Sequence, residues 1–372
     1  MVFPATRRVV RLMVPIIATC AVVGSAPSQC PTAAFVPVPT AMPMSPSQPA
    51  HRNVAILIAL GSPGRAVKVM PGVEPGDLDA LIIGGGPAGL TCATYLARYR
   101  RKVVVVDSGK SRAALIPETH NYPGFADGIA GTSLLEALTS QAKTYGVEII
   151  GDWIAELQRV EGGFEARYSR GIIGARRAVM ASGLVDRDLG DPDLREAVGY
   201  GLVRYCPICD GFEASDLRIG VLGSADDAGT KALFLRTYSR QVTLLTLDGK
   251  DCGEPFSREL SEAGIRLPEA HAVGFRRQDK QMIVSLSDGT VEAFDVIYPV
   301  LGCEVRSELG RKLGARHNDT GCLEVDAHQR TNVPGLYAVG DAVSDLHQIA
   351  VATGHAAVAA TDIHNSLPRN FR

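Results

Sequence analysis

The sequence predicts an α/β protein built from two Rossmann-like units. The first unit has a short apolar strand at Asp79–Ile83, a glycine-rich turn, a helical pattern from Leu90 to Arg100 and then a second strand. The second unit repeats this order of elements from Arg218 onward. A strand, a glycine turn, a helix and a second strand in this order are typical of a βαβ unit. Two such units in 372 residues predict two domains.

The composition is that of an ordinary folded protein. The chain is 46% apolar and 21% charged, which is enough apolar material for a full core. The net charge is −2 with both signs interspersed, so charge gives no basis for expecting nucleic acid or a membrane surface as a partner. The 8 cysteines are too sparse for a disulfide scaffold. Only one pair is closely spaced, which predicts a reducing, cytoplasmic compartment with one special pair.

Residues 1–76 differ from the rest of the chain. Arg7, Arg8 and Arg11 precede an apolar run at 12–24, and a tract rich in proline, serine and threonine follows. The run is too short to span a bilayer, but its pattern resembles an export signal, including a twin-arginine signal. We expect instead an extension that is disordered or not translated, with Met70 as an alternative start. The segment is excluded from the fold prediction.

The first glycine loop predicts dinucleotide binding. Gly84 permits the tight turn, Gly86 lets the backbone approach a pyrophosphate, and Gly89 allows the helix to pack closely on the strand. Pro87 and Ala88 then open a helix whose free N–H groups face the anion. Asp107 ends the strand that follows, where a carboxylate binds ribose hydroxyls. The alternative for Asp107 is an ordinary surface acid.

The second unit has the same order of elements but a poorer phosphate loop. Its strand at 218–223, helix at 228–238 and strand at 241–247 are predicted by the same patterns. Ala225 stands where a second glycine is needed, and Asp226 and Asp227 lie where phosphates would come. The closing strand ends at Asp248, with no arginine placed to hold a 2′-phosphate. An added methyl group and two carboxylates both disfavour a pyrophosphate.

The C-terminal region adds a further strand and helix. Residues 331–341 predict a turn, a short strand and an acidic loop ending in Gly340 and Asp341, and a helix follows at 348–364. An aspartate at a strand end, beside a helix start, is placed to bind a ribitol hydroxyl or, through water, a phosphate. The alternative is a turn that only starts a helix.

Cys206 and Cys209 form the chain's one Cys-x-x-Cys sequence, and four interpretations compete for it. Tetrahedral zinc needs further ligands at short spacing, which the sequence does not offer. A purely structural bridge would close a very small loop and gain little entropy, and two unrelated thiols remain an alternative. Reversible dithiol–disulfide exchange is the interpretation we favour, since a thiolate beside a redox cofactor can pass electrons. Cys252, Cys303 and Cys322 are interpreted as structural.

These pieces together resemble the low-molecular-weight thioredoxin reductase family over residues 78–367. The segments that carry the resemblance are Gly84–Gly89 with Asp107, Asn121-Tyr122-Pro123-Gly124, Ala181-Ser182-Gly183, Cys206-Pro207-Ile208-Cys209-Asp210-Gly211-Phe212, Gly340-Asp341 and His347-Gln348-Ile349-Ala350. The resemblance implies two three-layer ββα/βαβ domains, with a nicotinamide-type domain inserted into an FAD domain. It places the FAD domain at 77–187 and 311–372, and the inserted domain, which carries the cysteine pair, at 188–310.

The resemblance also assigns roles to residues. Cys209 would lie against the flavin and Cys206 would attack the partner disulfide, while Asp210 would protonate a departing thiolate if burial raises its pKa. The alternative for Asp210 is a cap on the turn before Gly211. FAD would be bound by Gly84, Gly86, Pro87, Ala88, Gly89, Asp107, Asn121, Gly183, Gly340, Asp341, His347, Gln348 and Ile349. A solvated loop is the alternative for His347, and the role of Asn121 depends on the family context.

The predicted function is an FAD-dependent, thioredoxin reductase-like oxidoreductase. Electrons would pass from NAD(P)H through FAD and the cysteine pair to a thioredoxin-like protein or a small disulfide, in a homodimer. Family members that use NADPH have an intact second loop and an arginine-rich run after its strand, so NADPH specificity does not carry over, and NADH is expected to serve no worse. One alternative is a flavin disulfide reductase or dithiol oxidase that does not use NAD(P)H but ferredoxin, another flavoprotein or oxygen. Another is a non-catalytic FAD redox sensor.

Overall fold

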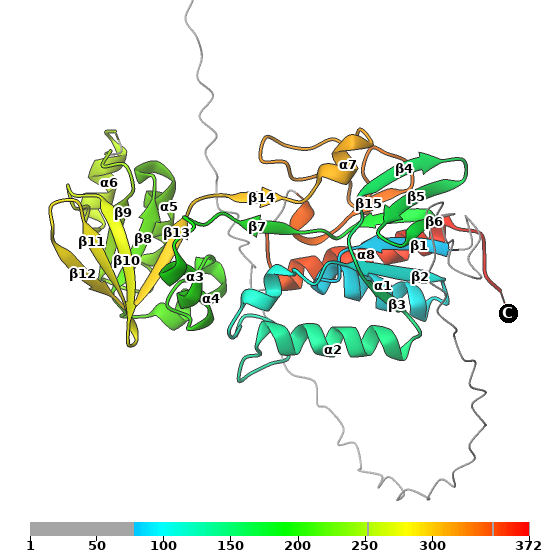
Figure 1. Cartoon of the computed structure of the whole chain (residues 1–372), viewed down its shortest axis with the longest axis horizontal. Helices are drawn as coiled ribbons and strands as arrows, with labels where there is room; N and C mark the ends of the chain where they lie inside the picture. Colours follow the sequence, from blue (N-terminus) through cyan, green and yellow to red (C-terminus); the bar gives the residue numbers. More distant parts are fainter. Residues whose placement is uncertain (1–77, 251–252, 344–345, 372) are drawn as a thin grey trace, which may run out of the picture. The chain divides into compact units, whose positions relative to one another are not determined.

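The computed structural model describes residues 78–250, 253–343 and 346–371, which fall within one compact unit, Pro63–Arg372 (Figure 1). The predicted N-terminal extension, Met70 and Cys252 lie outside the described residues. No helix in the described part of the chain is both long and apolar enough to cross a membrane.

A large sheet is the first layer around which the chain is built. Its strands run in the order β3-β2-β1-β6-β5-β4, and β15 also pairs with β6. β1, β2, β3, β6 and β15 are parallel, whereas β4 and β5 are joined to β6 as an antiparallel extension. The bounds are β1 Leu78–Ile83, β2 Val103–Asp107, β3 Glu148–Gly151, β4 Glu156–Val160, β5 Gly163–Tyr168, β6 Gly171–Met180 and β15 Leu336–Ala338.

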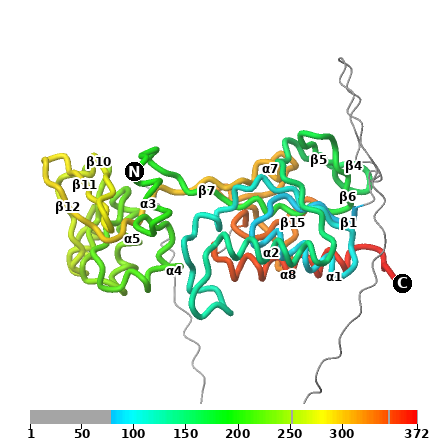
Figure 2. Tube along the Cα trace, turned by 60° about the horizontal axis from the view of Figure 1, so that its bottom comes forward, coloured from blue at the N-terminus to red at the C-terminus, as the bar shows by residue number. Residues whose placement is uncertain are grey.

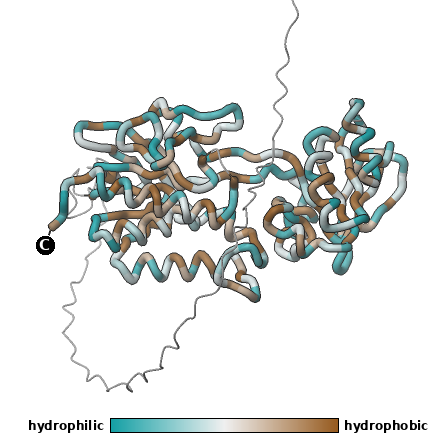
Figure 3. Tube along the Cα trace, turned by 180° about the vertical axis from the view of Figure 1, so that it is seen from behind, coloured by the Kyte–Doolittle hydropathy of each residue, from teal (hydrophilic) through white to brown (hydrophobic). Residues whose placement is uncertain are grey.

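Strand alternation explains why this sheet is buried on both faces. In β1, Ala80 and Ile82 pack into one apolar cluster with the helices, while Leu81 and Ile83 pack into another with β4 and β5. Successive side chains of a strand point to opposite faces, so a continuous apolar run fits a strand covered on both sides. Figure 3 shows this distribution, with brown apolar residues inside and mostly teal turns at the periphery.

Helices α1, α2 and α8 cover one face of the large sheet and lie beside one another (Figures 1 and 2). The small residues of α8, such as Ala356 and Ala359, are fully buried and let α8 pack tightly against α1. The helical segments of this part are α1 Pro87–Arg98, η1 Arg112–Leu115, α2 Gly131–Thr144, α7 Glu308–Lys312, η3 Gly340–Ala342 and α8 Ile349–Ser366.

A second group of elements is formed by residues 192–300. Its parallel sheet has the order β13-β8-β9, and a separate antiparallel sheet has the order β10-β11-β12. Two apolar clusters fill this part, one around α5 and one beneath the antiparallel sheet. The strands are β8 Ile219–Gly223, β9 Val242–Thr246, β10 Ala272–Gln278, β11 Gln281–Leu286, β12 Val291–Phe294 and β13 Val296–Val300. The helices are α3 Pro192–Gly199, α4 Pro207–Asp210, η2 Phe212–Ala214, α5 Ala225–Leu235 and α6 Phe256–Glu262.

Two antiparallel strands, β7 (Leu184–Asp186) and β14 (Cys303–Val305), carry the chain into and out of this second group. The predicted domain boundary at 310/311 falls inside α7. Leu309 of α7 packs against the core of the large sheet, so the chain has already returned to that core. The helix predicted at 228–238 is corrected, because α5 begins at Ala225 and ends at Leu235.

A buried carboxylate on α8 provides a test of the packing. Asp362 accepts hydrogen bonds from Arg330 Nε at 2.7 Å and from the hydroxyl of Tyr337, which is itself buried, at 2.7 Å. Burial alone would raise the pKa of Asp362, but these bonds lower it.

We expect Asp362→Ala to lower the free energy of unfolding by about 2 kcal/mol, because the buried Tyr337 hydroxyl loses its acceptor. Denaturant unfolding measures this change. Because the pKa is lowered in the folded state, the difference from wild type should be present above the ordinary pKa of an aspartate and shrink as the pH falls through the lowered value. Glu308→Ala, which removes the exposed pair with Lys312, is the control and should change little. An equal effect of the two substitutions would contradict the packing argument.

Candidate active site

The first glycine loop is pressed against the end of β6. Gly84 has φ +111°, and a Cβ there would overlap the carbonyl oxygen of Ala181. A Cβ at Gly89 would overlap the carbonyl oxygen of Gly84. Both positions therefore require glycine, as the sequence predicted for a tight turn and for close packing of helix on strand.

The start of helix α1 is open to an anion. Gly86 is the N-cap residue in extended conformation, no side chain caps the helix, and no acid lies in its first turn. The first N–H groups of a helix have no partner within the helix and favour negative charge. This end of α1 therefore has donors available for a phosphate group.

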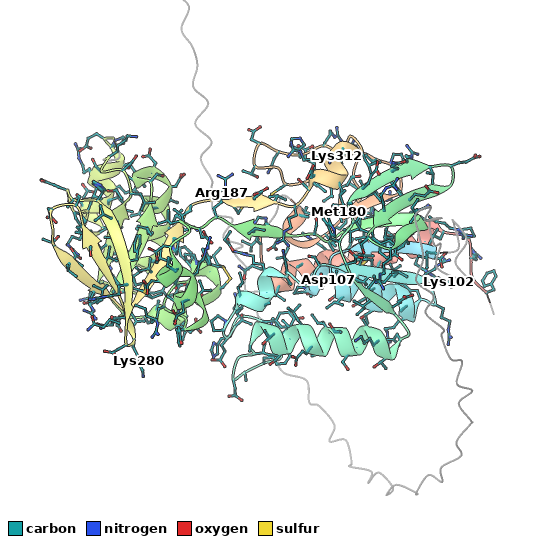
Figure 4. All side chains as sticks on the ribbon, viewed as in Figure 1. Lys102, Asp107, Met180, Arg187, Lys280 and Lys312 are labelled. Carbon is teal, nitrogen blue, oxygen red and sulfur yellow. A yellow bond between two sulfur atoms is a disulfide. The ribbon has the colours of Figure 1, made fainter. Side chains whose placement is uncertain are left out.

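Asp107 at the end of β2 fixes the loop. Its Oδ1 accepts a hydrogen bond of 2.9 Å from the backbone N–H of Gly85. Asp107 is half-buried and faces the cavity described next, at the strand end shown in Figure 4. The carboxylate thus lies where a ribose hydroxyl would meet it.

One cavity of about 1220 Å³ joins the predicted residues. Its walls come from the glycine loop, the end of β2, the loop before α8 and the cysteine segment. The predicted residues that line it are Gly84, Gly86, Pro87, Ala88, Asp107, Asn121, Gly183, Cys206, Cys209, Asp210, Gly340, Asp341, His347, Gln348 and Ile349. Gly89 is the exception and serves packing instead. This volume exceeds that of a usual drug-sized site and suits an extended cofactor. The donors at α1 and the carboxylate of Asp107 fit FAD.

Arg112 is a site residue that the sequence did not reveal. Its Nε and Nη2 bind the carboxylate of Asp186 at 2.6 and 2.9 Å, and its Nη1 lies 3.5 Å from Asp341 Oδ2. It links the 3₁₀ segment η1 to β7 and to the acidic loop. No motif in a single sequence connects these three residues. Trp153 and Lys312 also line the cavity without having been predicted.

Cys206 and Cys209 form a disulfide with a Cα–Cα distance of 5.3 Å. Cys206 is the N-cap residue of α4, and its sulfur accepts a hydrogen bond of 3.2 Å from the backbone N–H of Cys209. Both cysteines are half-buried, whereas Ile208 between them is exposed. Among the residues that the structure describes, no group of three or more metal-ligating side chains is present. The disulfide therefore lies in the wall of the cavity with one edge toward solvent.

Gln348 and Asn121 lie beside the disulfide. Gln348 Nε2 is 3.3 Å from each sulfur, and Asn121 Nδ2 donates to Gln348 Oε1 at 2.9 Å. Asn121 also donates to the carbonyl oxygen of Ile208 at 3.3 Å. The cysteine segment is thus hydrogen-bonded to the loop at 119–121 and to the start of α8.

His347, Gly340 and Gly183, which were also predicted as site residues, make no hydrogen bond to the disulfide among those of the described residues. His347 is half-buried, and its Nε2 is 3.4 Å from the carbonyl oxygen of Val343. Gly340 has φ +68°, and a Cβ there would crowd Ala88 at the start of α1. Gly183 accepts from the N–H of Arg306 at 2.9 Å, which joins the two crossings of the chain.

Asp210 is a half-buried acid with one strong side-chain partner. Burial raises the pKa of Asp210 to about 6. The hydrogen bond from Tyr298 lowers this pKa, but its effect is smaller than that of burial. The Tyr298 hydroxyl donates to Asp210 Oδ1 at 2.8 Å, and Arg204 donates to the backbone oxygen of Asp210 at 3.0 Å. Tyr298 lies on β13 and is fully buried. A carboxyl with this pKa can give up a proton near neutral pH.

The second phosphate loop differs from the first at the helix start. Ser224 is the N-cap residue of α5, its Oγ accepts from Asp227 N at 3.3 Å, and it also bonds Asp227 Oδ2 at 2.9 Å. Asp226 and Asp227 both lie in the first turn of α5, where acids complement the helix dipole. The anion-binding end of this helix is therefore already occupied by the chain's own groups. At the end of the adjacent strand, Asp248 pairs with Lys250 at 3.1 Å.

Comparison with known proteins places this arrangement among flavin disulfide enzymes. The family model described as "Pyridine nucleotide-disulphide oxidoreductase" matches residues 78–356. A thioredoxin reductase from Mycolicibacterium smegmatis is 30% identical over 299 residues, covering 76% of this chain and 94% of that protein.

Solved structures confirm the predicted fold class. The structure titled "Crystal structure of HlmI" is 31% identical, with a TM-score of 0.73, covering 79% of this chain and 93% of that one. A thioredoxin reductase from Streptococcus pyogenes superposes with a TM-score of 0.72 at 24% identity, covering 78% of this chain and 98% of that one, and supports the fold alone.

Tyr298→Phe should raise the pKa of Asp210 by about one unit above its value of about 6, because the carboxylate loses a hydrogen bond that stabilises its charged form. Difference infrared spectroscopy of the protonated carboxyl band across a pH series measures this. Asp210→Asn identifies the band by removing it. A pKa that stays unchanged or falls in Tyr298→Phe would contradict the assigned hydrogen bond.

Proposed function

Because the chain belongs to the pyridine nucleotide-disulphide oxidoreductase family, as an FAD-dependent disulfide oxidoreductase of the thioredoxin reductase type, we propose that it reduces a disulfide substrate through Cys206 and Cys209. The observation that carries this proposal is that the disulfide lines the same cavity as the glycine loop and Asp107. The redox cofactor and the redox cysteines would thus share one site.

The cofactor would be held by the first Rossmann unit. The backbone N–H groups of Gly86 and Ala88, on either side of Pro87, would meet the pyrophosphate, and Asp107 would accept from the ribose. Gly340 and Asp341 would lie along the ribitol chain. FAD, when bound, supplies two-electron chemistry to the cysteine pair.

Disulfide exchange then follows from the cysteine geometry. Two electrons open the Cys206–Cys209 bond, and the Cys206 thiolate attacks the substrate disulfide to form a mixed disulfide. The substrate's first sulfur leaves as a thiolate and takes a proton, which Asp210 supplies in its protonated form. The Cys209 sulfur next gives up its proton and attacks Cys206 Sγ, so that the disulfide is restored and the second substrate sulfur leaves as a thiolate that takes this proton. Asp210 suits this role because burial holds its pKa at about 6.

The substrate class is a thioredoxin-like protein or a small disulfide. The exposed Ile208 between the cysteines supports an outward-facing edge that a partner can reach. We further propose a cytoplasmic location, where a dithiol is kept reducible, and a homodimer as in the resembling family.

A second candidate function differs from the first in its electron donor. Members of the family use NAD(P)H, but the start of α5 is capped by Ser224 and carries Asp226 and Asp227. These groups do not fit a pyrophosphate, in contrast to the open start of α1. The second candidate is therefore a flavin disulfide reductase or dithiol oxidase that exchanges electrons with ferredoxin, another flavoprotein or oxygen.

Cys206→Ser should abolish turnover of a model disulfide while leaving FAD bound, because the attacking sulfur is lost. Stopped-flow and steady-state assays with a chemically reduced flavin measure this. Cys303→Ser, at a half-buried free cysteine outside the cavity lining, is the matched control and should retain turnover. Equal turnover of Cys206→Ser and wild type would refute the proposed function.

Anaerobic titration of the flavoprotein tests the donor. If α5 excludes a pyrophosphate, neither NADH nor NADPH should bleach the flavin at stoichiometric concentration, whereas reduced ferredoxin should. If a nicotinamide is used nevertheless, Asp248 and the lack of a 2′-phosphate arginine lead us to expect NADH to serve no worse than NADPH. Rapid bleaching by NADPH alone would contradict both expectations.

A further inference from the structure

We propose that the side-chain amide of Gln348 stabilises negative charge on the sulfur of Cys206 once the disulfide is opened, and that Thr119 and Asn121 hold this amide in place. The proposal rests on the proposed function only in taking reduction of the pair as its starting point. It assigns Gln348 a role toward the sulfurs in addition to its place in the cofactor cavity.

The geometry places one amide nitrogen between two sulfurs. Gln348 Nε2 lies 3.3 Å from Cys206 Sγ and 3.3 Å from Cys209 Sγ. Disulfide sulfurs are weak acceptors, so these bonds contribute little while the bridge is closed. A thiolate is a charged acceptor, and hydrogen bonds to charged groups are roughly twice as strong as neutral ones. The amide therefore interacts more strongly with the reduced pair than with the oxidised pair.

A directed chain of hydrogen bonds fixes which end of the amide faces the sulfurs. The Thr119 hydroxyl donates to Asn121 Oδ1 at 3.0 Å, and Asn121 Nδ2 donates to Gln348 Oε1 at 2.9 Å. Thr119 is buried and is paired in both directions with the backbone of Ile129. Because the oxygen of Gln348 is already an acceptor for Asn121, its NH₂ group faces both sulfurs. The same oxygen also lies 3.7 Å from Cys209 Sγ, where it can accept from a Cys209 thiol but not from a Cys206 thiolate.

The two sulfurs are not equivalent. Cys206 Sγ also accepts from the backbone N–H of Cys209 at 3.2 Å, so it has two N–H donors. Gln348 is the one donor to Cys209 among the hydrogen bonds of the described residues. Two electrons and one proton convert the disulfide into one thiol and one thiolate. The second donor places the thiolate on Cys206 and the thiol on Cys209, which agrees with Cys206 as the attacking residue.

The test measures the pKa of the Cys206 thiol in a Cys209→Ser background, where no second thiol titrates. Iodoacetamide alkylation of Cys206 in the FAD-loaded protein is followed by mass spectrometry across a pH series. Gln348→Met keeps the length of the side chain and removes the donor. It should raise the Cys206 pKa by about one to two units, as expected for a lost hydrogen bond to a charged group. Asn121→Leu, which frees the amide to turn, should give a smaller rise.

Gln158→Met, on the exposed strand β4, is the matched control and should leave the pKa unchanged. In the chain with both cysteines, the equilibrium with dithiothreitol gives a second readout, and Gln348→Met should shift it toward the disulfide by roughly tenfold or more. Visible absorbance of bound FAD verifies that each variant is folded.

An unchanged Cys206 pKa in a folded Gln348→Met variant would overturn the proposal. If that variant does not fold, Gln348→Glu keeps the shape and replaces the donor by an acceptor, and an unchanged pKa there would overturn it equally. A pKa shift without disulfide turnover in wild type would refute the proposed function but not this inference. Disulfide turnover in wild type without a pKa shift in Gln348→Met would refute this inference but not the proposed function.

Discussion

The close approach of Gly84 to the backbone of Ala181 is the contact on which the rest of the site depends. It brings the end of β1 against the end of β6, so that the first turn of α1 starts directly over the edge of the sheet. Parallel strands end at the same edge, and the loops after β2 and β15 therefore arrive there too. A side chain at Gly84 would overlap the carbonyl oxygen of Ala181 and force these strand ends apart.

The two Rossmann units show that topology and ligand chemistry are separate properties. β8, α5 and β9 repeat the order of β1, α1 and β2, yet α1 starts with free donors and α5 starts with a serine cap and two acids. The cap and the acids stabilise the second helix in the way that a bound anion would stabilise the first. The second unit can therefore keep its fold without a ligand at that position, and fold similarity alone does not establish that it binds a nucleotide.

The sequence predicted the parts of the site that depend on local backbone constraints. Gly84, Gly86 and Asp107 stand at positions that the βαβ geometry requires, so one sequence is enough to find them. Helix limits were less accurate, because α5 begins at Ala225, directly after its Ser224 cap and three residues before the predicted start at Ala228. The pairs Arg112–Asp186 and Tyr298–Asp210 were not predicted, since they join segments far apart in the chain and neither has a local signature.

The groups around the disulfide favour a charged sulfur on Cys206 and a neutral carboxyl on Asp210. Disulfide exchange requires both, a thiolate to attack and an acid to supply a proton. Amide and backbone N–H donors around Cys206 lower the free energy of a thiolate, the form that attacks a disulfide. Burial of Asp210 raises the free energy of its carboxylate, so that a proton remains available near neutral pH. If burial raised the pKa of the Cys206 thiol as it raises that of Asp210, the thiolate would be protonated before it could attack. Because the donors to sulfur and the donor of the proton are different groups, a charged nucleophile and a protonated, neutral acid can line the same cavity.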